Sequence, residues 1–95
     1  MSQDLYELHL IISGRVQGVG FRYFTQKEAQ RLGIVGWVRN TMDERVEIVS
    51  SGDKAILEEF LSKVEQGPPG STVTHIKTRW NRVDHMDSSD FAITY

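Results

Sequence analysis

The order of two hydrophobic periodicities along the chain restricts its fold more than any single residue does. Four stretches alternate apolar and polar residues, as half-buried strands do: residues 5–13, 35–40, 45–50 and 72–80. Two stretches instead carry apolar residues at the spacing of an α-helix: residues 22–32 and 54–65. The predicted order is therefore βαββαβ, with a short terminal strand at Phe91, Ile93 and Tyr95.

Both predicted helices have recognisable ends. Gly33 follows the first helix, and glycine is favoured just after helix C-termini. Asp53 precedes the second helix and is a good N-cap, because its carboxylate can accept a hydrogen bond from a free backbone N–H. The run Gly67-Pro68-Pro69-Gly70 ends that helix, since proline cannot continue it.

Two helices are too few to cover both faces of a four-stranded sheet. We expect them to pack on one face of an antiparallel sheet, which is the ferredoxin-like, split βαβ arrangement of the α+β class. The 95 residues form a single domain, 1–95, without a linker, repeat or low-complexity stretch. Because this architecture serves many functions, the function has to be inferred from particular residues.

Composition excludes several classes of chemistry. The chain has no cysteine, so disulfides, thiolate nucleophiles and cysteine-based zinc sites are excluded. Its formal net charge of −2 leaves no broad basic surface, and we predict no nucleic-acid partner. There is no signal-peptide pattern, and no apolar run approaches the ~18 residues of a membrane span. We therefore expect a cytoplasmic protein without a membrane partner, and nothing demands more than a monomer.

The segment Gly14-Arg15-Val16-Gln17-Gly18-Val19-Gly20-Phe21-Arg22 joins a predicted strand to a predicted helix. Glycines at 18 and 20 allow backbone N–H groups to turn inward, and the helix N-terminus adds further unpaired donors. Such a loop suits a phosphoryl group, with Arg22 placed to clamp two of its oxygens. A turn that only reverses the chain is the commoner use of this spacing. The segment is neither a Walker A loop nor a dinucleotide fingerprint.

A second segment, Gly36-Trp37-Val38-Arg39-Asn40-Thr41, places an asparagine at the end of a predicted strand. The carboxamide of Asn40 can accept a hydrogen bond from water while its NH₂ group donates elsewhere, although it is no strong base. An asparagine that only begins a turn is the commoner explanation for such a position.

The two segments together resemble the acylphosphatase family. Residues 14–22 match its signature Gly-Arg-Val-Gln-Gly-Val-x-Phe-Arg, and residues 36–40 match its companion Gly-Trp-Val-x-Asn. The Gly67-Pro68-Pro69 stop and the ending Phe91-x-Ile93-x-Tyr95 are also similar, so the resemblance covers nearly the whole chain. It implies a hydrolase that cleaves the carboxyl–phosphate bond of acylphosphates without a metal or other cofactor.

The resemblance also implies roles for individual residues. Arg22 would bind the phosphate, Asn40 would position the attacking water, and Thr41 would help to orient the Asn40 side chain. The phosphate would be cradled by backbone N–H groups of one loop: Arg15, Val16, Gln17, Gly18, Val19 and Gly20. The implied partners are a small-molecule acylphosphate as substrate and inorganic phosphate as product.

One position departs from the family pattern. Glu44 stands in the turn after Asn40, where the family usually has glycine. A positive φ suits glycine and is unfavourable for glutamate, so Asp43 becomes the candidate for a left-handed residue. A misplaced Asn40 would leave a non-catalytic module that binds phosphate or another anion, which is the alternative to the hydrolase.

The residues at hand fit this reaction on chemical grounds. The leaving group is a carboxylate whose acid has a pKa near ~4, so it departs without a general acid. Phosphoryl transfer depends mainly on positioning and charge stabilisation, which an asparagine, an arginine and a ring of amides can supply. The same site would serve a phosphate monoester poorly, because its alkoxide is a far worse leaving group.

Other candidate sites have weaker support. The three histidines lack the spacing of metal ligands, and the acidic run at residues 84–90 lacks that of a calcium loop, so we predict no metal site. Several arginines together with Trp37 and Trp80 leave RNA binding on the open sheet face as a distant alternative. The strand motif of RNA-recognition modules is absent, and packing in the sheet is the simpler role for both tryptophans.

Overall fold

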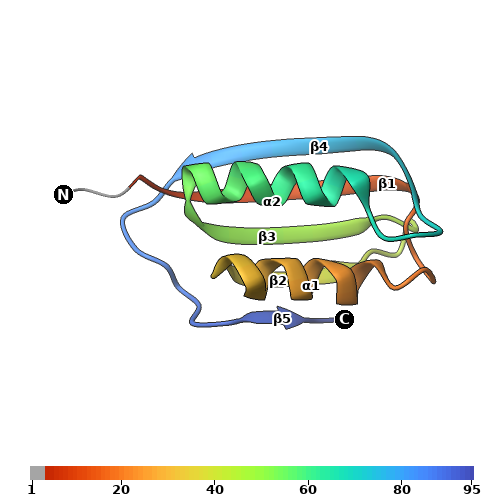
Figure 1. Ribbon diagram of the computed structural model, residues 1–95, viewed down its shortest axis with the longest axis horizontal. Helices are drawn as coiled ribbons and strands as arrows, with labels where there is room; N and C mark the ends of the chain where they lie inside the picture. Colours follow the sequence, from red (N-terminus) through yellow and green to blue (C-terminus); the bar gives the residue numbers. More distant parts are fainter. Residues whose placement is uncertain (1–3) are drawn as a thin grey trace.

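The structure, a computed structural model, describes residues 4–95. Its elements along the chain are β1 (Leu5–Arg15), α1 (Phe21–Leu32), β2 (Val35–Asn40), β3 (Val46–Asp53), α2 (Lys54–Gln66), β4 (Thr72–Arg82) and β5 (Phe91–Ile93). The predicted order βαββαβ, with a short strand at the end, is confirmed (Figure 1).

All five strands belong to one sheet, in the order β4-β1-β3-β2-β5. The first four pair antiparallel, as predicted. β5, the short terminal strand, adds a parallel pairing with β2 at this edge, with Gly36 opposite Phe91. After β4 the chain crosses the end of the sheet through residues 83–90 and enters β5 from the end at which β2 begins, which makes the pairing parallel (Figure 1).

Both helices cover the same face of the sheet, as the ferredoxin-like arrangement predicts (Figure 1). The alternation predicted for β1 is confirmed, because Leu8, Leu10 and Ile12 are fully buried beneath the helices. The side chains that fill the core between the two layers are almost completely buried: Leu8, Leu10, Ile12, Val38, Val46, Ile48, Leu57, Phe60, Val64 and Phe91. This core fixes the ends of the strands and helices from which the site is built.

The two helices begin differently. α2 is capped by Asp53, as predicted, because its carboxylate accepts a hydrogen bond from the backbone N–H of Ala55 at 3.0 Å. α1 begins after Gly20, which has no side chain to act as a cap, and its first turn contains no acidic residue. The free N–H groups at the start of α1 therefore have no side-chain partner within residues 4–95. Neither of these helices has the length and apolar character needed to cross a bilayer.

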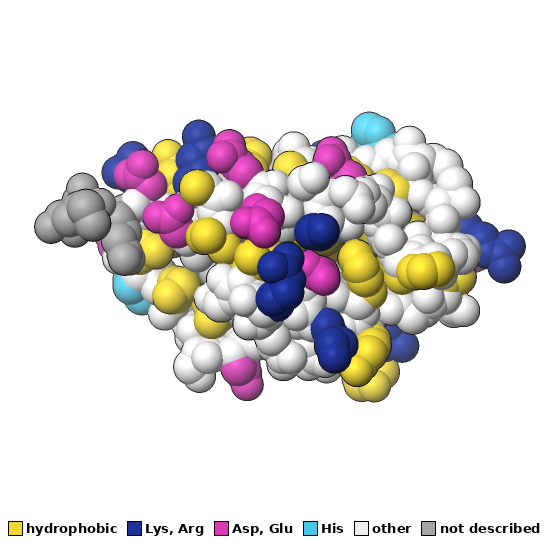
Figure 2. All heavy atoms as spheres, viewed as in Figure 1, with side chains coloured by type: hydrophobic (Ala, Val, Ile, Leu, Met, Phe, Trp, Pro, Cys, Tyr) yellow, Lys and Arg dark blue, Asp and Glu magenta, His cyan; other side chains and the backbone are white. Residues whose placement is uncertain are grey.

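The two tryptophans lie on opposite faces of the sheet. Trp80 stands opposite Leu8 on the helix-bearing face, and its ring meets that of Tyr6 edge-on at 6.1 Å between centroids. Trp37 lies on the open face, where the Arg39 guanidinium is 6.0 Å from its ring centroid. Rings on opposite faces cannot form one stacking platform for bases. On the helix-bearing face basic and acidic side chains are interspersed, which also disfavours RNA binding (Figure 2).

Candidate active site

Three segments that are far apart in the sequence meet at one end of the sheet. They are the loop between β1 and α1, the turn between β2 and β3, and residues 93–95 at the end of β5 (Figure 1). They enclose a pocket of about 210 Å³. Five of the predicted site residues line it: Val16, Gly18, Gly20, Arg22 and Asn40. The other four lie outside the lining: Arg15, Gln17, Val19 and Thr41.

The loop between β1 and α1 presents its backbone to the pocket. Gly18 and Gly20 have φ values of 74° and 78°, in the left-handed region that glycine adopts most easily. Apart from the glycine itself and its two chain neighbours, no residue of the described chain comes within 4 Å of where a Cβ would stand at either position, so the chain there borders open space. The uncapped N-terminus of α1 follows directly and adds free N–H groups with a partial positive charge. Both features favour an anionic ligand.

Other residues of the loop anchor it to the fold. Arg15 is the last residue of β1 and pairs with Thr72 of β4. The side chain of Val16 is buried, and that of Val19 packs against the core. Because both valines are held by packing, the backbone between them has a defined shape before a ligand arrives, as a phosphate site requires.

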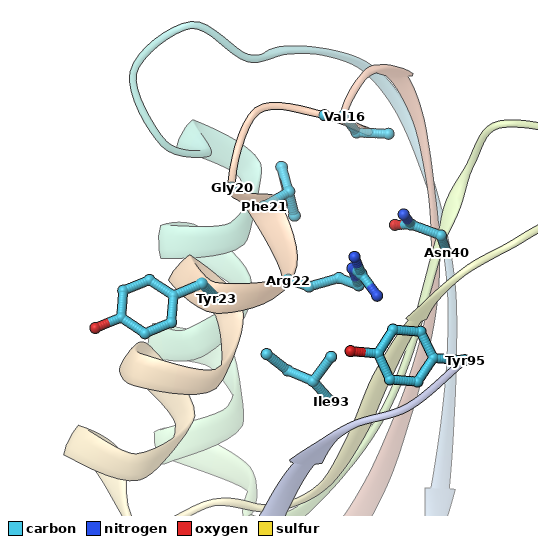
Figure 3. A pocket seen from close by; sticks show the side chains of 9 residues that line it. Val16, Gly20, Phe21, Arg22, Tyr23, Asn40, Ile93 and Tyr95 are labelled. Carbon is cyan, nitrogen blue, oxygen red and sulfur yellow. The ribbon is translucent and has the colours of Figure 1, made fainter.

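Arg22 extends from the first turn of α1 toward Asn40 (Figure 3). The ring of Tyr95 lies beside its guanidinium, with 5.1 Å between Cζ and the ring centroid. No carboxylate of residues 4–95 forms an ion pair with Arg22. An arginine that contacts an aromatic ring and no carboxylate keeps its charge and its fork of donors for a ligand.

The wall formed by the end of β5 was not predicted as part of the site. Ile93 and Tyr95 line the pocket on the side of Arg22; Tyr23 also lines it, but its ring is directed away from Arg22 (Figure 3). The sequence pattern assigns Ile93 and Tyr95 to a terminal strand and gives them no role in the site. Their place beside Arg22 depends on the parallel pairing of β5 with β2, which no periodicity in the sequence specifies.

Asn40 is the last residue of β2, as predicted, and pairs with Val46 of β3. Its side chain lies on the helix-bearing side because it alternates in step with the buried Val38. Since α1 begins on that side, the strand brings the carboxamide to the same pocket as the Arg22 guanidinium (Figure 3).

The turn after Asn40 is held by its own side chains. The Thr41 hydroxyl donates to the Asp43 carboxylate and accepts from the backbone N–H of Arg45 at 3.0 Å. Hydrogen bonds from the Arg45 guanidinium and from Thr41 lower the pKa of Asp43 to about 2, so this carboxylate is charged near neutral pH. A role of Thr41 in orienting Asn40 would therefore pass through the turn, because its hydroxyl is already engaged there.

Glu44 has a φ of 67° and is the only non-glycine residue with a positive φ among residues 4–95. Asp43 was the expected left-handed residue, and that expectation is wrong. The Asp43 carboxylate accepts hydrogen bonds from Thr41 and Arg45, and the left-handed conformation is adopted by the next residue, Glu44. The turn nevertheless closes, with Thr41 N donating to Arg45 O at 2.8 Å, and the reason for expecting a misplaced Asn40 is removed.

Replacing Glu44 with glycine is expected to leave the free energy of unfolding unchanged or to raise it by up to about 1 kcal/mol. Glycine relieves a left-handed strain of ~1–2 kcal/mol, and the greater freedom of its unfolded chain offsets part of that gain. Urea denaturation of the wild type and Glu44→Gly measures the difference. Glu44→Ala is the matched control, because it keeps the strain and should gain nothing. A large loss of stability in Glu44→Gly would mean that the glutamate side chain holds the turn.

The donor set of the pocket suits an anion. An arginine, an asparagine and backbone N–H groups line it. Elsewhere in residues 4–95, no three His, Asp or Glu side chains come together as metal ligands would.

Known proteins are similar to this chain in both sequence and structure. The acylphosphatase family model matches residues 8–93. An acylphosphatase of Archaeoglobus fulgidus is 44% identical over 85 residues, which cover 90% of this chain and 96% of the relative. The crystal structure of acylphosphatase from Bacillus subtilis has a TM-score of 0.90 and 42% identity, covering 95% of this chain and 99% of that one. This chain therefore belongs to the acylphosphatase family.

Proposed function

We propose that this acylphosphatase-family hydrolase cleaves the carboxyl–phosphate bond of acylphosphates by in-line attack of water on phosphorus. The observation that carries the proposal is that Arg22 and Asn40 face each other in one pocket beside the uncapped start of α1. A cation, a ring of N–H donors and a neutral carboxamide are the groups that such a reaction needs.

The phosphoryl group binds to the glycine-bearing loop and to Arg22. Backbone N–H groups of residues 15–20 and of the first turn of α1 donate to its oxygens, and the guanidinium clamps two of them. These donors are fixed before the substrate arrives, so they stabilise the charge on the equatorial oxygens in the transition state without rearranging.

Asn40 positions the nucleophile. Its amide oxygen accepts a hydrogen bond from a water molecule and holds the water in line with the bond that breaks. The water oxygen bonds to phosphorus as the bond from phosphorus to the acyl oxygen breaks, and the electron pair leaves with the carboxylate. The protons of the water end on the inorganic phosphate product and in solvent. A carboxylate is a stable leaving group, so no general acid is needed.

Hydrolysis of benzoyl phosphate in excess chelator tests the proposal, with wild type and Asn40→Ala compared. The wild type should turn over at full rate, since the proposed chemistry uses no metal. In Asn40→Ala we expect kcat to fall by about 10²-fold or more, because the water is no longer held in line. Inhibition by inorganic phosphate should be unchanged, because Arg22 and the loop remain.

Unchanged turnover in Asn40→Ala would contradict the role of Asn40 as the group that positions water. Phosphate binding by a folded wild type without any turnover would favour the non-catalytic module. Ser50→Ala serves as the control for folding, because it removes a buried hydrogen bond to Leu8 O in β1, away from the pocket.

We further propose that the protein acts in the cytoplasm as a monomer on a small-molecule acylphosphate, with neither nucleic acid nor a membrane as partner. The net charge of −2 and the interspersed surface charges support the absence of a nucleic-acid partner. Gel filtration and an RNA-binding titration at two salt concentrations test the oligomeric state and the partner class.

A further inference from the structure

The side chain of Gln17 connects the phosphate loop, residues 15–20, to the turn at residues 41–45 that follows Asn40. Its Nε2 donates to the backbone carbonyl of Thr41 at 3.0 Å and to that of Arg45 at 2.8 Å. Both acceptors are carbonyls, so the amide nitrogen, and not the amide oxygen, faces the turn. One glutamine of the phosphate loop thus uses both of its N–H groups on the turn that follows Asn40.

The two carbonyls that Gln17 binds also close this turn. Arg45 O accepts from Thr41 N at 2.8 Å, and Thr41 O accepts from Glu44 N at 3.3 Å. Gln17 therefore binds the two residues at the base of the turn, Thr41 and Arg45, and does not contact the residues between them through these hydrogen bonds. Thr41 is joined directly to Asn40, so a shift at this base moves the backbone that carries the carboxamide.

The turn has little else to hold it in place. Residues 42–45 are exposed, and Met42 is fully so. Thr41, Asp43 and Arg45 bond mainly to one another. Within residues 4–95, the two bonds from Gln17 are the only side-chain hydrogen bonds that join the turn to a segment outside it.

We propose that Gln17 is a positioning residue that ties the phosphate loop to the turn and so keeps Asn40 aligned with the bound phosphoryl group. Phosphate held by the loop and water held by Asn40 come from different segments, and in-line attack requires a fixed distance between them. The side chain of Gln17 sets that distance without touching either reactant. This inference rests on the proposed roles of the loop and of Asn40.

A double-mutant cycle on kcat tests the inference. Gln17→Met keeps the length of the side chain and removes both donors. We expect kcat for benzoyl phosphate to fall by about 10-fold or more in Gln17→Met, with inhibition by inorganic phosphate changed by less than about 2-fold. In the Asn40→Ala background the same change should lower kcat by less than about 2-fold, because Asn40 no longer holds the water in line and its alignment therefore no longer matters.

A second substitution, Gln17→Lys, keeps hydrogen-bond donors at this position. Its ammonium can donate to both carbonyls, so we expect kcat to recover most of the loss seen in Gln17→Met. A kcat no higher than that of Gln17→Met would overturn the proposal that the donors matter. If Gln17→Met is too unstable to assay, Gln17→Lys is compared with the wild type instead, and a kcat about 10-fold or more below that of the wild type would overturn the proposal.

The outcomes separate the inference from the function on which it rests. An equal loss of kcat on Gln17→Met in both backgrounds would overturn the inference, because Gln17 would then act independently of Asn40. Full turnover in Asn40→Ala alone would instead overturn the proposed role of Asn40, and a folded wild type without turnover would overturn the proposed function. Ser50→Ala loses one side-chain hydrogen bond to a backbone carbonyl outside the site, and should lower stability but leave kcat unchanged.

Discussion

Replacing Arg22 with glutamine is expected to lower turnover of benzoyl phosphate by about 10³-fold or more and to weaken inhibition by inorganic phosphate. A single arginine that meets the charge of a transferred phosphoryl group is worth about 10³–10⁵-fold in rate. We propose this role for Arg22, because it reaches into the pocket from the first turn of α1 and forms no ion pair with a carboxylate of residues 4–95. Glutamine keeps a donor but loses the charge and the fork geometry.

Steady-state kinetics and phosphate inhibition of the wild type and Arg22→Gln make this measurement. Arg31→Gln is the matched control, because Arg31 lies on the same helix and pairs with Glu28 in solvent. It should leave both kcat and phosphate inhibition unchanged. Wild-type phosphate affinity in Arg22→Gln would refute the clamp, even if turnover were lost.

A large loss of stability is expected from Gly36→Ala. Gly36 has a φ of 140°, and a Cβ added there would lie 2.0 Å from the carbonyl oxygen of Val49 in the neighbouring strand. The left-handed strain of ~1–2 kcal/mol adds to a repacking cost of ~1–3 kcal/mol, because β2 has to move away from β3. We therefore expect the free energy of unfolding to fall by at least about 3 kcal/mol.

Urea denaturation of Gly36→Ala and Gly33→Ala separates the left-handed strain from the cost of repacking β2 against β3. Gly33 also has a positive φ, 72°, but among residues 4–95 nothing beyond its own helix and chain neighbours lies within 4 Å of the position of its Cβ. Gly33→Ala should therefore lose only the strain, about 1 kcal/mol. Equal losses in the two variants would show that the close approach of the Val49 carbonyl has no energetic consequence.

Periodicity predicted the elements of the fold well, because their core positions repeat. Leu8, Leu10 and Ile12 alternate in β1 and are all buried, so the strand and its inner face follow directly from the sequence. The pairing of β5 could not be predicted in this way. A strand of three residues carries almost no periodic signal, and its direction depends on the path of residues 83–90 around the sheet.

The sequence motifs predict which residues share the pocket, but they do not predict the tertiary contacts that surround it. Arg22 and Asn40 were expected to act together, and the structure brings them to one pocket. The contacts of Gln17 with the turn and of Tyr95 with Arg22 depend on how distant segments pack, which leaves no local pattern. At Glu44 the local preference of glutamate gave the wrong conformation, because hydrogen bonds around Asp43 and Arg45 outweigh it.

The difference between the capped α2 and the uncapped α1 links catalysis to thermodynamic stability. Asp53 gives α2 a permanent partner for its first turn, whereas the start of α1 has to take its partner from solution. A bound phosphate that satisfies those N–H groups stabilises the folded state by RT ln(1 + [L]/Kd), which is about 2.7 kcal/mol when its concentration is 100 times Kd. In the proposed mechanism the substrate is therefore part of the folded structure for as long as it is bound. Each release of phosphate from the proposed site would return the first turn of α1 to water, and the protein to the lower stability of its free form.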